Sequence, residues 1–341
     1  MIIEKLGVPM GIDKESDRIY KIIFDNLNKL EFPEEIEEDE ILLIRNTFIK
    51  INDLYSLIDI VLYLDYNEAV IKPKLISFGC GSKNQIQLIS KKLFVKQKTN
   101  VFVITVSVGA INKKEIIETI INVKKSIISH ELMHFYDQYK NDKSGVEKTS
   151  QYYSYNITDF PPIISKFIYL LYYMTSFENI VRPSQIYKDL IDNNISKDQF
   201  YDFMESSSVI KMIKTSKNFS LNRFRNNLNI NLDVKQFLKN KNLLGDDSSY
   251  IILNLLFSAL LNNYTNIVDE FVKRYIDDNK LSDKELDIVN NNFRKIISEM
   301  KKYEKNPIKY FEFLEKKLNF DGNNAYKKLY KLYDMVSDNK I

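Results

Sequence analysis

The chain has 341 residues, of which 44% are hydrophobic and 28% are charged, and its formal net charge is +3. This composition excludes a disordered chain and provides enough apolar residues for one large domain or two lobes. Because lysines and acidic residues are interspersed along most of the chain, we expect no nucleic-acid partner.

The N-terminal part predicts one helix followed by a sheet. A helix is expected around Asp17 to Leu30, and β-branched and aromatic residues then alternate with polar ones from about Glu40 to Val108. The clearest strands are Ile58–Asp65 and Val101–Val108, and Gln97–Asn100 has the character of a hairpin connection. These segments together predict an antiparallel sheet of four or five strands.

The only cysteine, Cys80, lies in the run Gly79-Cys80-Gly81, which predicts a turn between two strands. We therefore interpret Cys80 as a small turn residue rather than a zinc ligand. A single cysteine excludes an internal disulfide and fits a reducing compartment. Residues 1–10 contain no basic region followed by an apolar stretch, so we expect no signal peptide and a cytoplasmic protein.

From Asn112 onward the pattern of apolar residues becomes helical. It leads into the run Ser129-His-Glu-Leu-Met-His134, which contains both histidines of the chain. Residues four apart lie on one face of an α-helix, so His130 and His134 are expected one turn apart on the same face. The apolar positions that precede the run are Ile116, Ile117, Ile120, Ile121, Ile127 and Ile128.

Further helices follow to the end of the chain. Pro161 and Pro162 are expected to open a helix that continues to about Val181, where Pro183 ends or kinks it. Ser282-Asp-Lys-Glu285 is a capping box before a helix to about Tyr303, and a proline at position 307 begins another.

Two apolar stretches could be mistaken for membrane spans. Phe160–Phe177 contains two prolines and a lysine, and Tyr250–Leu261 is short and contains an asparagine. We therefore predict that both are buried helices and that the chain has no membrane span. The change from strands to helices predicts an α+β lobe over residues 1–141 and a helical lobe over residues 142–341.

The histidine run has the residues of a catalytic zinc site. His130 and His134 can each offer a ring nitrogen to one ion at about 2.0 Å. Glu131 then projects beside the ion and can take a proton from a zinc-bound water, whose pKa falls to about 7. The run therefore predicts a Zn²⁺ centre with Glu131 as general base.

A catalytic zinc site needs a third protein ligand, and no histidine remains to supply it. The third ligand must then be a carboxylate, and we favour Glu178 because it lies in an apolar stretch of the next long predicted helix. The alternative is that Glu178 ends a helix and pairs with Arg182. In the favoured case the helical lobe supplies the third metal ligand.

The combination of His130, Glu131, His134 and a later Glu178 resembles the gluzincin group of zinc metallopeptidases. Thermolysin-like members of that group place His-Glu-x-x-His on one helix and the ligand Glu on a later helix. The resemblance implies a zincin-like α+β fold: an antiparallel sheet, the active-site helix and a mainly helical lobe. It also implies a peptide or protein substrate.

The chain departs from that pattern in one place. Thermolysin-like enzymes carry an acid four residues after the ligand Glu, whereas this chain has Arg182. The Glu-x-x-x-Arg ending is similar to small peptidase-like proteins of tailed phages and their hosts, which implies a phage-associated location as an alternative to a cytoplasmic one.

Several residues have secondary roles in this hypothesis. Asp137 is expected to orient a ligand histidine or to bind Arg182, unless it is a surface acid. An oxyanion would need a donor near the zinc, for which the chief candidates are Tyr173 and Tyr155. Val101–Val108 is expected to be either the edge strand that binds an extended peptide or an ordinary buried strand. The other tyrosines that are candidate donors are Tyr152, Tyr153 and Tyr172.

Two functions therefore compete. The first is a zinc peptidase that hydrolyses peptide bonds. The second is a catalytically inactive protein of peptidase-like fold with a binding or structural role, for example in a virion or in host interaction. It is favoured by the long helical remainder, in which no further chemistry is recognisable.

Overall fold

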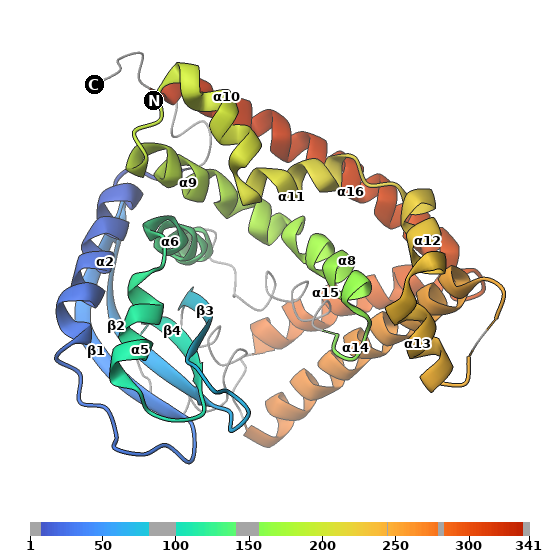
Figure 1. Ribbon diagram of the computed structural model, residues 1–341, viewed down its shortest axis with the longest axis horizontal. Helices are drawn as coiled ribbons and strands as arrows, with labels where there is room; N and C mark the ends of the chain where they lie inside the picture. The colour runs from blue at the N-terminus through green and yellow to red at the C-terminus, as the bar shows by residue number, and fades with distance from the viewer. Residues whose placement is uncertain (1–7, 82–99, 141–156, 244, 279–282, 337–341) are drawn as a thin grey trace. The chain divides into compact units, whose positions relative to one another are not determined.

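The computed structural model of the chain describes residues 8–81, 100–140, 157–243, 245–278 and 283–336. Within these residues it contains a four-stranded sheet and twelve α-helices, so the fold is mixed α/β and mostly helical. The chain divides into two compact units (Figure 1). The first unit comprises Met1–Gly145, Ile180–Asp198 and Leu332–Ile341, and the second comprises Val146–Asn179 and Gln199–Lys331.

The first unit holds the sheet and the helices that pack on it. The strands are β1 Glu40–Ile51, β2 Leu54–Tyr66, β3 Lys74–Gly81 and β4 Asn100–Val108. The helices are α2 Ile12–Leu27, α5 Lys113–Ile121, α6 Lys125–Lys140 and most of α9 Ser176–Asp192. The helix expected around Asp17 to Leu30 and the expected extended region from Glu40 are thus confirmed.

The sheet has the strand order β1-β2-β4-β3 and is mixed. β1 pairs with β2 and β3 pairs with β4 in antiparallel fashion, but β2 and β4 run parallel. The prediction of a purely antiparallel sheet is therefore wrong at this central pair. The reason is visible in β4, where every residue after Asn100 is buried: parallel strands need both faces covered and read as nearly continuous apolar runs.

The place of β4 also decides between the two interpretations of Val101–Val108. β4 lies between β2 and β3, so it is an interior strand, and the prediction that it forms the peptide-binding edge is wrong. Gly79-Cys80-Gly81 is not a turn either, because these residues end β3 and pair with Val103, Phe102 and Val101 of β4. The expected hairpin at Gln97–Asn100 lies, apart from Asn100, outside the described residues.

One apolar core joins the sheet to its helices. Ile60 and Leu62 of β2 and Phe102 and Ile104 of β4 pack in one cluster with residues of α2, α5 and α6. Figure 1 shows these three helices beside the blue strands. Side chains alternate between the two faces of a strand, so neighbouring residues of β2 and β4 can belong to different clusters. Val61, Val101 and Val103 form a separate small cluster.

Helix α9 is attached to this unit by both apolar and polar contacts. Val181 belongs to the apolar core cluster. The hydroxyl of Ser129 on α6 donates to the carbonyl oxygen of Ser184 on α9 at 3.5 Å. The Ser184 hydroxyl lies 3.4 Å from the Ser129 carbonyl oxygen, but its nearer acceptor is the Val181 carbonyl oxygen at 2.8 Å. The buried Lys188 donates to Asp17 of α2 at 2.8 Å and to Asp192 of its own helix at 2.6 Å. These contacts hold α9 against α6 and α2.

The helix expected from Pro161 to Val181 is in fact two helices. α8 runs over Pro162–Tyr173, the chain turns at Met174 and Thr175, and α9 begins at Ser176. Pro183 lies inside α9, so it does not end the helix, and the expected alternative of a kink stays a prediction. The break comes earlier because Thr175 caps the new helix: its Oγ1 accepts the backbone N–H of Glu178 at 3.4 Å.

The second unit is helical around an aromatic core. The ring of Phe167 on α8 lies 5.3 Å from Phe219, 4.8 Å from Phe224 and 6.2 Å from Phe311. Gly322 lets two helices approach closely, because a Cβ there would lie 2.5 Å from the backbone nitrogen of Lys217. Its helices are α8, most of α10 Lys197–Ser206, α11 Ser208–Lys217, α12 Leu221–Ile230, α13 Leu232–Asn240, α14 Ser248–Asp278, α15 Asp283–Lys301 and α16 Pro307–Tyr330.

The last two helices, α15 and α16, agree with the helices predicted from the sequence. α16 begins at the expected proline, and α15 covers the helix expected before Tyr303, although Ser282 of its capping box lies outside the described residues. Among the described residues, one helical segment, Ser248–Lys273, is long and apolar enough to cross a membrane. Its Leu253, Leu256 and Leu260 are fully buried in the unit, as expected for a core helix.

The lysine that joins α9 to α2 generates a stability prediction. Replacing Lys188 by Met should lower the free energy of unfolding by about 1.5–3 kcal/mol, because two hydrogen bonds between charged groups are lost. Lys125→Met is the matched control: Lys125 also pairs with Asp17, at 3.2 Å, but is 41% exposed, so about 0–1 kcal/mol is expected. Urea denaturation measures both, and equal losses would contradict the assigned role of Lys188.

The same contacts predict a pH dependence. Burial acts to raise the pKa of Asp17, but hydrogen bonds and charge from Lys188 and Lys125 hold that pKa below its ordinary value. A lowered folded-state pKa stabilises the fold above the unfolded pKa of about 3.9 and loses this effect as the pH falls through the folded value. The stability gap between the wild type and Asp17→Asn should therefore narrow in strong acid.

Urea midpoints from neutral to strongly acidic pH would measure this gap. Asp25→Asn, a change at an exposed acid of the same helix, is the control. A gap that stays constant over this range would rule out the proposed contribution of Asp17.

Candidate metal centre

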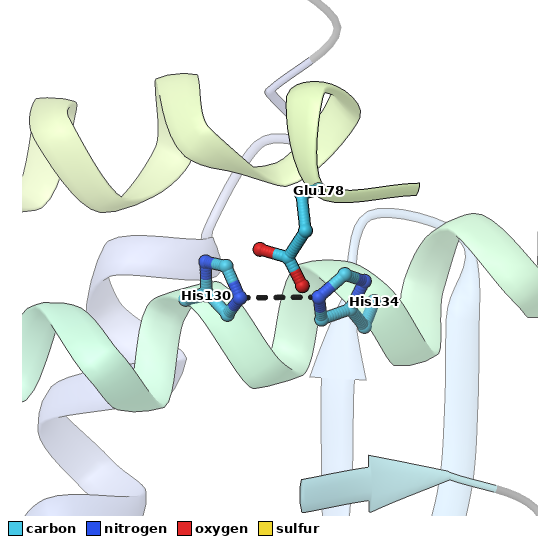
Figure 2. A group of neighbouring side chains, drawn as sticks. All are labelled: His130, His134 and Glu178. Atoms are coloured by element: carbon cyan, nitrogen blue, oxygen red, sulfur yellow. Dashed lines mark hydrogen bonds between the residues drawn. The ribbon is translucent and has the colours of Figure 1, made fainter. Parts of the chain in front are cut away.

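Helix α6 brings the two imidazoles together. Its core-facing side carries Ile128, Leu132 and Phe135, which belong to the apolar cluster of the first unit. His130 and His134 lie one turn apart and point away from that core toward α9 (Figure 2). Their Nε2 atoms are 3.1 Å apart and their rings are nearly perpendicular, at 87°. The expected common face of the two histidines is therefore confirmed.

Glu178 comes to the same point from the first turn of α9. The ligand atoms of His130, His134 and Glu178 all lie within 4.8 Å of one another, and all three residues are buried. Figure 2 shows the carboxylate reaching down from α9 between the two rings. This cluster is the group of metal-ligating side chains that the described part of the chain assembles, and Cys80 does not belong to it.

The geometry of the histidines fits a tetrahedral ion. Two nitrogens that each lie about 2.0–2.1 Å from one ion at a tetrahedral angle are about 3.3 Å apart. The observed separation of 3.1 Å needs only a small adjustment. Two nitrogens and one carboxylate form a donor set that zinc accepts, so the three residues can hold a metal ion.

The position of Glu178 explains how its charge is tolerated with 0% of the residue exposed. It lies in the first turn of α9, where the helix dipole stabilises a carboxylate. The hydroxyl of Tyr172 on α8 donates a short hydrogen bond to its Oε1. Arg182, one turn later, donates to Gln185 Oε1 at 3.0 Å, and the expected alternative of a pair between Glu178 and Arg182 stays a prediction.

Glu131 lies beside the cluster without belonging to it. Its Oε1 is 3.9 Å from Nε2 of His130, and its side chain is 16% exposed. Across from it, burial raises the pKa of the Cys80 thiol, and the negative charge of Glu131 adds to this effect.

The other expected site residues have different positions. Asp137 is half-buried on α6, three residues after His134, and its role toward a histidine or Arg182 stays a prediction. Tyr173 is buried on α8, with its ring 5.6 Å from that of Tyr169, and its oxyanion role is likewise untested. The candidates Tyr152, Tyr153 and Tyr155 lie outside the described residues.

The sequence indicated Tyr172 only as one of five candidate oxyanion donors and not as the tyrosine that binds Glu178. The signal that could have found it is the run Thr175-Ser-Phe-Glu178, because Ser/Thr-x-x-Glu marks the start of a helix. A helix beginning at Ser176 leaves Tyr172 at the end of the helix before it, close to the first turn that carries Glu178.

Comparison of the chain with known protein families, with curated proteins and with solved structures found no match. The candidate centre therefore rests on the residues of this chain alone.

The ligand set leads to a direct prediction of metal binding. The purified protein should bind one zinc ion per chain, and His130→Ala, His134→Ala or Glu178→Ala should each weaken binding more than about 100-fold, because even residues behind the ligands contribute 10–100-fold. Competition with a zinc-binding dye measures the affinity. Glu118→Ala, at an exposed acid of α5, is the control, and an unchanged affinity in any ligand variant would remove that residue from the set.

Proposed function

We propose that the protein is a zinc-dependent hydrolase that cleaves peptide bonds. One observation carries the proposal: His130, His134 and Glu178 cluster on two neighbouring helices, and a fourth side chain, Glu131, lies next to them with its carboxylate outside the cluster. Three protein ligands with an adjacent acid are the groups that metal-assisted hydrolysis requires.

Each residue has a separate part in this reaction. The two imidazoles and Glu178 would hold a zinc ion, which when bound polarises a carbonyl and lowers the pKa of a water to about 7. Glu131 would take a proton from the attacking water and deliver it to the leaving amine. The carboxylate suits both roles because its side chain is largely buried and therefore shielded from bulk solvent.

A specific observation favours the alternative of a metal-binding protein without turnover. The exposed fractions are 7% for His130, 5% for His134 and 0% for Glu178, and structural metal sites are closed whereas catalytic ones keep an open position. In that case the metal would join α6 to α9 and stabilise the fold. The peptidase proposal remains the stronger one because a purely structural site gives no role to Glu131.

The general base supplies the decisive test. Glu131→Gln should retain one zinc per chain but lower the rate of peptide cleavage by about 10²–10⁴-fold, because the amide cannot accept the proton. Cleavage of a broad peptide library, read by mass spectrometry, measures activity, and Glu118→Gln is the matched surface control. A Glu131→Gln protein with the wild-type rate would refute the assigned base.

The same experiment separates the two functions. Full zinc occupancy in the wild type together with no cleavage of any library member would favour the structural role. Removal of the ion by a chelator would then lower the melting temperature, because a metal that binds only the folded state stabilises it.

A further inference from the structure

The start of α9 has the sequence of a capping box but forms only half of one. In a capping box, the Thr side chain accepts the N–H of the Glu three residues later, and the Glu side chain accepts the N–H of the Thr. The first bond is present, since the Glu178 N–H donates to Thr175 Oγ1 at 3.4 Å. The second bond is replaced, because the carboxylate of Glu178 points to the histidines instead.

The backbone of Tyr172 replaces the missing hydrogen bond of the capping box. The backbone N–H of Thr175 donates to the carbonyl oxygen of Tyr172 at 3.0 Å, so this buried donor does not need the carboxylate of Glu178. The chain turn between α8 and α9 therefore satisfies the Thr175 N–H through the backbone and not through Glu178.

The side chain of the same tyrosine then acts on the carboxylate. The Tyr172 hydroxyl donates to Oε1 of Glu178 in a short hydrogen bond. A hydrogen bond to a charged acceptor is about twice as strong as one between neutral groups, and at a fully buried carboxylate it replaces lost hydration. One oxygen of Glu178 thus has a donor from the protein, while the carboxylate also faces the imidazoles.

We propose that Tyr172 is a positioning residue of the metal centre, which directs Glu178 to bind the ion through one oxygen. With Oε1 held by the phenol, the carboxylate offers its other oxygen, and the two histidines complete three protein ligands. This arrangement favours the four-coordinate geometry that zinc adopts over the higher coordination that two-oxygen binding gives. The inference rests on the metal centre of the proposed function and not on peptidase activity.

Cobalt(II) substitution tests the proposal with a signal that does not depend on turnover. Tyr172→Phe removes only the hydroxyl, and we expect it to weaken zinc and cobalt binding by about 10–100-fold. The visible absorption bands of the cobalt protein should also lose intensity, because the ion gains a fifth ligand when both oxygens of Glu178 bind. Tyr169→Phe is the matched control: it lies on the same helix, is 52% exposed, and should change neither quantity.

A double-mutant cycle separates positioning from a general structural role. In a Glu178→Gln background, Tyr172→Phe should have little further effect on metal affinity, since the charged acceptor is gone. The melting temperature of the metal-free Tyr172→Phe protein should stay close to that of the metal-free wild type. Equal effects of Tyr172→Phe in both backgrounds would contradict the proposal.

The outcomes distinguish this inference from the proposed function. A Tyr172→Phe protein with wild-type affinity and an unchanged cobalt spectrum would overturn the positioning role, whether or not the protein is a peptidase. Weaker binding and fainter bands, in a protein that cleaves no peptide, would leave the positioning role standing and refute the peptidase. A wild-type protein that takes up neither zinc nor cobalt would overturn both.

Discussion

The candidate centre depends on how α9 packs against α6. One helix can place two imidazoles a turn apart by its own geometry, but the third donor has to come from elsewhere, and here it comes with α9. Val181 in the apolar core, the paired serines Ser129 and Ser184, and the buried Lys188 fix that helix in place. Without these contacts, the carboxylate of Glu178 would have no reason to lie near the histidines.

The polar groups near the candidate centre make different interactions and have different roles. The Thr175 hydroxyl starts α9, and the Tyr172 backbone accepts the N–H that Glu178 would otherwise satisfy. Glu178 is then balanced by a phenol and a helix dipole, while Glu131 stays on α6 beside the imidazoles. Two carboxylates at the same place thus have different surroundings, as the proposed roles of ligand and proton acceptor would require.

The amino-acid sequence predicts the parts of this structure that local patterns determine. The spacing of His130 and His134 required a shared face, and an acid in an apolar stretch pointed to Glu178. The nearly continuous apolar run of β4 is typical of a parallel strand, but it does not identify β2 as the partner, because the neighbour of a strand depends on contacts with distant segments. Pro183 was misleading for a related reason: tertiary contacts of α9 outweigh the local cost of a proline inside a helix.

That proline has a mechanical consequence for the centre. Pro183 has no backbone N–H, so the carbonyl of Asn179 cannot make its usual bond one turn ahead. The first turn of α9, which carries Glu178, is therefore held to the rest of the helix by one backbone hydrogen bond fewer than a helix without proline would have. The boundary between the two compact units falls at this same peptide link, between residues 179 and 180. The position of this first turn thus depends partly on side-chain contacts such as the hydrogen bond from Tyr172 to Glu178.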